Sequence, residues 1–186
     1  MFDMIKNALN VREDDVLAIS LRLSRFEDKC DDDPVSITLG LSFLDENDVE
    51  WPLAEVTGTM YNGMDTDYCL TDYAKWMDDH YADHGVAGKL ACQYYKENYS
   101  DPNGFYPGSV LYIRNIELKT KNANPDARGF ILENIGDLYE HCVGLKPNII
   151  TMIFDSTERD IKECVSDDYL ISSEGDTCFV DFDAAL

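Results

Sequence analysis

The stretch VLYIRNIELKTKNANPDARGFILE, residues 110–133, contains a strand, a loop and the start of a helix. The first nine residues are rich in β-branched and aromatic side chains, which favours a strand that ends near Leu118. The loop KTKNANPD follows, where Asn124 is expected to cap a helix and Pro125 to occupy its first position. Apolar residues then recur at helical spacing, namely Ile131, Ile135, Leu138 and Cys142, and Gly144 suits the helix end. The stretch therefore predicts a strand–loop–helix unit whose helix spans about 126–142.

Three predicted strands precede this unit. Residues 16–25 and 35–43 alternate apolar and polar side chains, as half-buried strands do. A third strand is expected at about 53–61, where Gly58 weakens the pattern. Short acidic loops join the three strands. The pattern predicts an antiparallel meander, preceded by a short amphipathic helix at 2–10.

Helices are expected between the third and fourth strands, as an insertion at about 68–100. The first is expected to end near Gly85, and a second to follow it. After the main helix, residues 148–154 form an unbroken apolar run, which is typical of a strand covered on both faces. A short helix at about 157–165 and strands at about 169–172 and 177–182 complete the chain. This order predicts an α/β fold: a single domain, 1–186, with a mixed sheet of about seven strands flanked by helices.

The strand Leu111–Leu118 and the loop and helix after it resemble the GNAT family, the GCN5-related N-acetyltransferases. In that family a strand of the type LYLDRIEI leads into a loop of the type R-G-x-G-x-G/A and then a helix. Here the strand reads LYIRNIEL, and Arg128 and Gly129 stand in the R-G positions. The resemblance covers residues 108–155 by motif, and the three earlier strands by order only.

The resemblance implies a site for coenzyme A, in which backbone N–H groups at the helix start bind the pyrophosphate. The residues that would contact the cofactor, if it binds, are Ile116, Leu118, Arg128, Gly129 and Phe130. However, Ile131 and Glu133 occupy the next two glycine positions of the motif. Ile131 adds bulk where the backbone must approach the ligand, and Glu133 adds negative charge near a diphosphate. Both differences argue against acetyl-CoA as a cofactor, and no other cofactor is expected.

If the chain is an enzyme, the resemblance implies Glu117 as a base or water-holding group and Tyr169 as a general acid. The alternative for Glu117 is an exposed strand residue, and for Tyr169 a core tyrosine.

The chain is strongly acidic, with 37 Asp and Glu residues against 15 Lys and Arg and a net charge of −22. This charge disfavours direct contact with nucleic acid and with anionic membranes. It favours a basic protein partner, attracted by electrostatic steering. The alternatives are solubility alone and a salt-adapted proteome. The acidic clusters are Asp31–Asp33, Asp45–Asp48, Asp78–Asp79 and Asp167–Asp168; if they share one face, they could imitate the charge of a DNA duplex.

The remaining patterns indicate no metal site and no exported protein. His80 and His84 are four residues apart on a predicted helix, but the glutamate of an HExxH motif is missing, so a solvated acidic helix face is expected instead. The six cysteines form no CxxC pair, and they are expected to be reduced core thiols. No apolar run is long enough to span a membrane and no signal peptide is recognisable, which predicts a cytoplasmic protein.

Two functions are therefore expected from the sequence. The first is a non-catalytic, acidic GNAT-like protein that binds and inhibits a basic, nucleic-acid-handling partner, in the manner of DNA mimics and of the anti-defence proteins of phages or mobile elements. The alternative is an acetyl-CoA-dependent N-acetyltransferase that acts on an amine of a basic substrate. The oligomeric state is left open.

Overall fold

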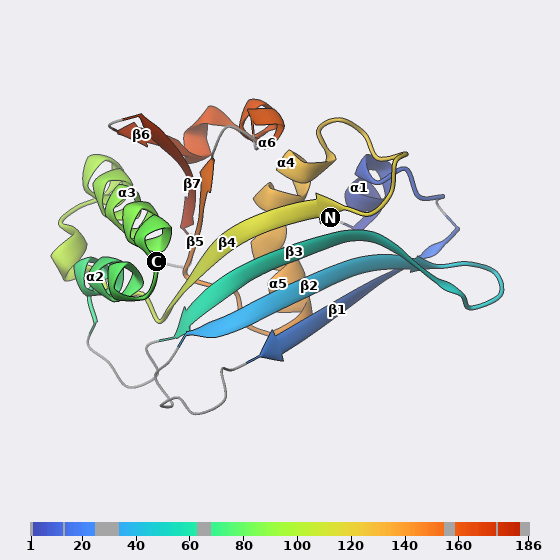
Figure 1. Cartoon of the computed structure of the whole chain (residues 1–186), viewed down its shortest axis with the longest axis horizontal. Coiled ribbons are helices and arrows are strands. Elements are labelled where there is room, and N and C mark those ends of the chain that lie inside the picture. Colours follow the sequence, from blue (N-terminus) through green and yellow to red (C-terminus); the bar gives the residue numbers. More distant parts are fainter. Residues whose placement is uncertain are drawn as a thin grey trace.

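The computed structural model describes residues 2–12, 14–24, 34–62, 68–154, 159–173 and 175–182. Within these residues the chain forms an α/β domain around one seven-stranded mixed sheet, as the sequence predicts (Figure 1). The strand order is β1-β2-β3-β4-β5-β7-β6. The cysteine Cys30 and the predicted acidic cluster Asp31–Asp33 lie outside the described residues.

The first three strands form the expected antiparallel meander. They are β1 (Val16–Ser24), β2 (Val35–Leu44) and β3 (Glu50–Asn62), and β4 (Ser109–Leu118) adds to β3, also antiparallel. The β3–β4 register shifts at Gly58, which leaves Arg114 as an extra residue in β4. A Cβ at position 58 would clash with the carbonyl oxygen of Tyr112, so the glycine that weakens the strand pattern is required by this bulge.

The other half of the sheet contains β5 (Ile149–Phe154), β6 (Leu170–Ser173) and β7 (Asp176–Phe182). β5 runs parallel to β4 and antiparallel to β7, and β7 pairs with β6. All but one of the β5 side chains are buried, because helices cover both faces of the sheet here, as the unbroken apolar run predicts.

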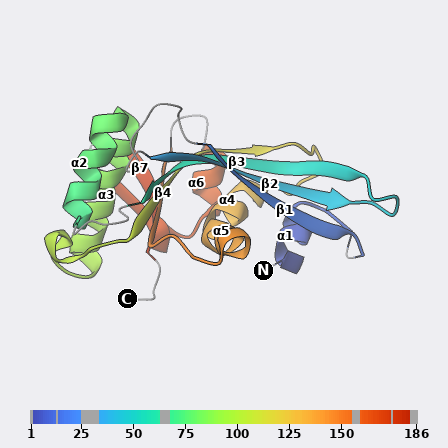
Figure 2. The ribbon, with the colours of Figure 1, turned by 90° about the horizontal axis from the view of Figure 1, so that it is seen from below.

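Helices pack on the two faces of the sheet in separate groups (Figures 1 and 2). One face carries α1 (Phe2–Ala8), α4 (Ala127–Glu133), α5 (Ile135–Val143) and α6 (Arg159–Cys164), and their apolar residues form one core cluster with the strands. The second cluster lies between the β4–β7 strands and the hairpin of α2 (Leu70–His80) and α3 (Ala82–Asn98). β4 supplies both clusters in alternation, with Val110 and Tyr112 facing α2–α3 and Leu111 and Ile113 facing the other way.

The predicted helix boundaries were wrong at three places. Gly85 does not end the first inserted helix; α2 ends at His80, Tyr81 is extended, and Gly85 lies inside α3. A Cβ on Gly85 would overlap Asp78, and one on Gly88 would lie 2.8 Å from the Cα of Ala74. These glycines therefore let α2 and α3 approach closely rather than stop a helix.

The main helix is also divided. Asn134 separates α4 from α5, and its Nδ2 donates to the carbonyl oxygen of Phe130 at 2.9 Å, so its side chain competes for a helical acceptor. The predicted cap at Asn124 is wrong as well: α4 begins after Asp126, while the Asn124 N–H and Nδ2 bond to the carbonyl oxygens of Ala8 and Asn7. The predicted end at Gly144 is confirmed, with a left-handed φ of 77°.

Short 3-10 turns precede β4 and β6, at η1 (Pro102–Gly104) and η2 (Asp167–Tyr169). No described helix has the length and apolar character needed to cross a membrane.

Candidate functional site

The strands β4 and β5 form a fork. They pair only where Val110–Tyr112 meet Ile149–Thr151, and beyond these three residues the two strands are no longer hydrogen-bonded to each other. The sequence places the proposed cofactor contacts at the open side of this fork, on β4 and at the start of α4. Whether the fork can admit a ligand depends on what occupies it.

Arg128 links the unpaired part of β4 to α6, the helix that follows β5. Its Nε donates to the Ile116 carbonyl oxygen at 2.8 Å, and its Nη1 lies 2.9 Å from both carboxylate oxygens of Asp160 on α6. The guanidinium therefore ties β4 to α6, with its side chain only 19% exposed. Two residues predicted to contact coenzyme A, Ile116 and Arg128, are bonded to each other.

Helix α4 also packs directly against α6. A Cβ on Gly129 would lie 2.6 Å from the Cβ of Cys164, so this glycine serves helix contact. Ile131 is fully buried in the core cluster that contains Ile116 of β4 and Met152 of β5. Glu133 accepts the N–H of Ser166 at 2.7 Å. Of the two residues that replace the motif's glycines, Ile131 thus belongs to the apolar core and Glu133 binds the segment after α6.

The other residues predicted to contact the cofactor belong to the same packing. Leu118 pairs with Ala54 in the β3–β4 ladder, and Phe130 is half-buried against the core.

Glu117 and Tyr169, the predicted catalytic pair, engage different partners. Glu117 is exposed on β4, where Lys119 Nζ lies 2.7 Å from its carboxylate and 3.7 Å from that of Glu55. The hydrogen bond that Lys119 donates to the Glu117 carboxylate raises the pKa of Lys119. Tyr169 packs its ring 5.3 Å from that of Phe179, and burial raises the pKa of its hydroxyl. Among the described residues, no hydrogen bond, ion pair or ring contact joins Glu117 to Tyr169.

The histidine pair is not the solvated helix face expected from the sequence. His84 is 2% exposed, and its Nδ1 lies 2.6 Å from the hydroxyl oxygen of Tyr61. Its ring also packs 3.9 Å from the ring of Tyr112. His80 instead places its Nδ1 2.9 Å from the carbonyl oxygen of Trp76. The described residues hold no cluster of three or more His, Cys, Asp or Glu suited to a metal ion.

Burial first, and then the positive charge of Arg114, lower the pKa of His84 to about 4, while Asp83 opposes the shift. Burial also raises the pKa of Tyr61. Both shifts favour the neutral forms of the phenol and the imidazole, and their hydrogen bond joins β3 to α3.

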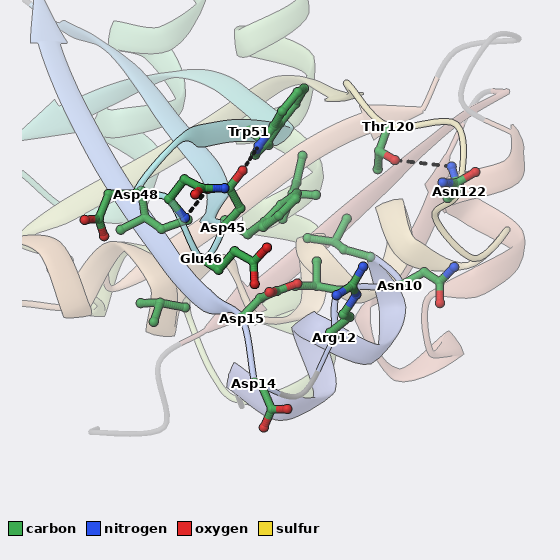
Figure 3. Close-up of a pocket in the computed structure, with 17 residues that line it drawn as sticks. Asn10, Arg12, Asp14, Asp15, Asp45, Glu46, Asp48, Trp51, Thr120 and Asn122 are labelled. Atoms are coloured by element: carbon green, nitrogen blue, oxygen red, sulfur yellow. Dashed lines mark hydrogen bonds between the residues drawn. The ribbon is translucent and has the colours of Figure 1, made fainter.

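A surface hollow of about 780 Å³ lies at the other end of the sheet (Figure 3). Its wall comes from the segment after α1, the β2–β3 turn and the loop after β4. Five carboxylates and one arginine line it: Asp14, Asp15, Asp45, Glu46, Asp48 and Arg12. Trp51 supplies an aromatic wall that is 51% exposed, stacked on Phe43 with ring centroids 6.5 Å apart. We refer to these residues as the acidic hollow.

The β2–β3 turn is held rigid by one carboxylate of the hollow. Asp45 accepts the N–H groups of Asn47 and Val49 at 2.8 and 3.0 Å, and the indole N–H of Trp51 at 3.0 Å. These hydrogen bonds, that from Trp51 first, lower the pKa of Asp45. Trp51 is therefore fixed in orientation even though half its surface faces solvent.

The sequence identified only part of this hollow. The acidic run Asp45–Asp48 is visible in the sequence, whereas its proximity to Asp14, Asp15 and Trp51 is not. The β1–β2 register pairs Val16 with Leu44, which brings two acidic segments thirty residues apart to the same end of the hairpin. This register was the signal that could have joined them.

Of the other predicted acidic clusters, Asp78–Asp79 and Asp167–Asp168 lie among the described residues, and neither lines the hollow. Asp78–Asp79 lie on α2 and Asp167–Asp168 lie in η2, whereas the β2–β3 turn lies at the far end of the sheet from α2 (Figure 1). Their distribution does not form one continuous duplex-like face.

Comparisons of the chain with known protein families, with curated proteins and with solved structures found no match. The function must therefore be inferred from this chain's own residues.

Replacing Arg128 with alanine is expected to lower the free energy of unfolding by about 2 kcal/mol, because the substitution removes a largely buried guanidinium and leaves the Ile116 carbonyl unpaired. Chemical denaturation monitored by circular dichroism measures this change. Asp160→Asn is the matched control: it keeps the bond to Ile116 and should cost less than about 1 kcal/mol. If both variants lost the same free energy of unfolding, the bond from Arg128 to β4 would not be its main contribution to stability.

Replacing His84 with glutamine is expected to flatten the dependence of stability on pH. In the folded chain the pKa of His84 is about 4, below its ordinary value of 6.5, so as pH falls the unfolded chain takes up the proton first. The folded wild type therefore loses stability between pH 6.5 and 4, by up to about 3 kcal/mol relative to the variant. Urea denaturation across this range measures the difference, and parallel curves would contradict it.

Proposed function

We propose that this chain is a non-catalytic, acidic protein with a GNAT-like fold that binds and inhibits a basic partner involved in handling nucleic acid. The acidic hollow is the single observation that carries the proposal. It combines five carboxylates with an exposed aromatic wall in a concavity of about 780 Å³. A guanidinium or ammonium group in the hollow would meet carboxylates on two sides and could stack on Trp51.

The net charge of −22 supports the same proposal at longer range. A basic partner is attracted before contact, and the attraction weakens as salt rises. The hollow then selects which basic segment stays bound, because Asp45 holds Trp51 in place before binding. Since the described acidic clusters lie apart, we place the contact in the hollow rather than along a continuous mimic of the duplex.

The GNAT-like fold is supported by the fork itself. A fourth strand, a loop and a helix lead into a parallel fifth strand, and pairing between the two strands is limited to three residues at one end. This geometry also favours the second candidate function, an acetyl-CoA-dependent N-acetyltransferase. The contacts of Arg128 weigh against that candidate, because a ligand in the fork would have to replace its bonds to Ile116 and Asp160. We propose accordingly that neither acetyl-CoA nor another cofactor is used.

Binding of a fluorescein-labelled oligo-arginine peptide tests the hollow directly, with fluorescence anisotropy as the readout. Neutralising Asp15 and Glu46 together (Asp15→Asn, Glu46→Gln) is expected to weaken binding by about tenfold at low ionic strength, because each charge contributes up to about 1 kcal/mol. Trp51→Ala should weaken binding as well.

The matched control removes the same two charges from the helical hairpin, as Asp79→Asn with Asp83→Asn. It should change the affinity by less than about twofold, because those carboxylates are far from the hollow. Equal weakening by both double variants would show that only total charge matters, and it would overturn the assignment of the hollow.

A further inference from the structure

The strand β1 is a long and regular edge strand. It pairs with β2 over all nine residues, from Val16 opposite Leu44 to Ser24 opposite Ser36, without a register shift. In contrast, the β2–β3 and β3–β4 ladders each contain a shift. Among the described residues no strand pairs with the other side of β1, so that side offers backbone N–H and C=O groups over about 30 Å (Figure 1).

Nothing in the sequence of β1 protects this edge. Natural edge strands are shortened, bulged, covered, or interrupted by proline or charge. The opposite edge, β6, has only four residues and contacts α3. β1 reads VLAISLRLS, which contains no proline, no glycine and a single charge, on Arg22. Two large apolar side chains of β1, Val16 and Leu23, are 60% and 54% exposed.

The charge of β1 is opposite to that of the chain. The whole chain has 37 acidic residues among 186, whereas the edge strand has none and carries one arginine. A strand that docks here therefore meets no local repulsion from carboxylates of β1. A second copy of β1 is itself free of carboxylates, and this property suits it to the position.

We infer that the β1 edge pairs with β1 of a second copy of this chain, antiparallel and around a two-fold axis at Ser20. In an antiparallel ladder, two residues that lie opposite each other point to the same face of the sheet. A two-fold axis perpendicular to the joined sheet can therefore pass only through a position where a residue lies opposite its own copy. Ser20 is the centre of Val16–Ser24, and this register alone pairs the whole strand with its copy. The two sheets then join into one, with α5 of each copy on the same face.

This register gives Leu23 and Arg22 suitable neighbours across the ladder. Leu23 lies opposite the partner's Leu17, which extends the apolar row formed by Leu17, Ile19 and Leu21 against the core. Arg22 lies opposite the partner's Ala18, which is small and uncharged. The two arginines are four residues apart along the ladder, at about 13 Å, beyond the screening length at physiological salt.

The overall charge opposes this dimer, since both copies carry −22. Screening by salt should therefore strengthen the dimer, whereas binding of a basic partner in the acidic hollow should weaken with salt. The inference does not depend on the proposed function, and the opposite salt dependences separate the two.

Sedimentation velocity of the full chain at several salt concentrations tests the dimer, and two substitutions at one position test its register. Ala18→Glu places a carboxylate opposite the partner's Arg22 twice in each dimer, and should tighten the dimer by about fivefold despite the added negative charge. Ala18→Arg places an arginine opposite the partner's Arg22 at the same two positions, and should weaken the dimer by a similar factor. If net charge alone governed association, the two effects would be reversed.

Cross-linking provides a second measurement of the same register. In Ser20→Cys the new thiols face each other across the axis, within reach of a disulfide. Oxidation should therefore give a covalent dimer linked through position 20 of both copies, identified by peptide mapping. Ala18→Cys is the matched control and should give no such link, because its two copies lie about 13 Å apart. A monomer at all salt concentrations would overturn the dimer, and cross-linking through position 18 would overturn the register.

Discussion

The bond network of Arg128 is the constraint on which the rest of the molecule depends. One guanidinium binds a strand carbonyl on β4 and a carboxylate on α6, across a fork that backbone pairing leaves open. Because Arg128 is mostly buried, these charge-assisted bonds are stronger than those of an exposed ion pair. With β4 and α6 tied together, Gly129 fits against Cys164 and Ile131 enters the core. The strand and helix that resemble a cofactor site, β4 and α4, are thus bonded to each other and packed against α6.

The second constraint is the distribution of charge. Most strand residues are apolar, and most of the described carboxylates lie in turns and on helices, where water screens the repulsion between them. The hollow concentrates this charge, because five carboxylates share its wall with one arginine and an exposed indole. Concentrated negative charge beside a fixed aromatic ring favours the binding of a cation, which relieves the repulsion between the carboxylates. The acid-free β1 strand is the other surface on which the local charge differs from the average.

Much of the fold could be predicted from the sequence, because alternation in β1 and β2 and the apolar run of β5 record which faces are buried. The helix boundaries could not be predicted where tertiary contact decides them. Gly85 reads as a helix end but serves the contact between α2 and α3, and Asn124 reads as a cap but bonds to the end of α1. Both residues have a local preference that a distant neighbour overrides.

The site was less predictable for the same reason. A motif indicates Arg128 and Gly129, yet their partners, Asp160 and Cys164, lie on a helix about thirty residues later. The hollow depends on the β1–β2 register, which brings Asp14 and Asp15 beside the turn of Asp45–Asp48. Neither contact can be predicted from the spacing of residues along the chain.

Isothermal titration of the wild-type chain with coenzyme A and with acetyl-CoA tests the closed fork most directly. The contacts of Arg128 predict no saturable heat up to millimolar ligand, in low salt and at physiological salt alike. Saturable binding in the micromolar range, abolished by Arg128→Ala, would contradict the account, because it would show that Arg128 holds the cofactor rather than the fork.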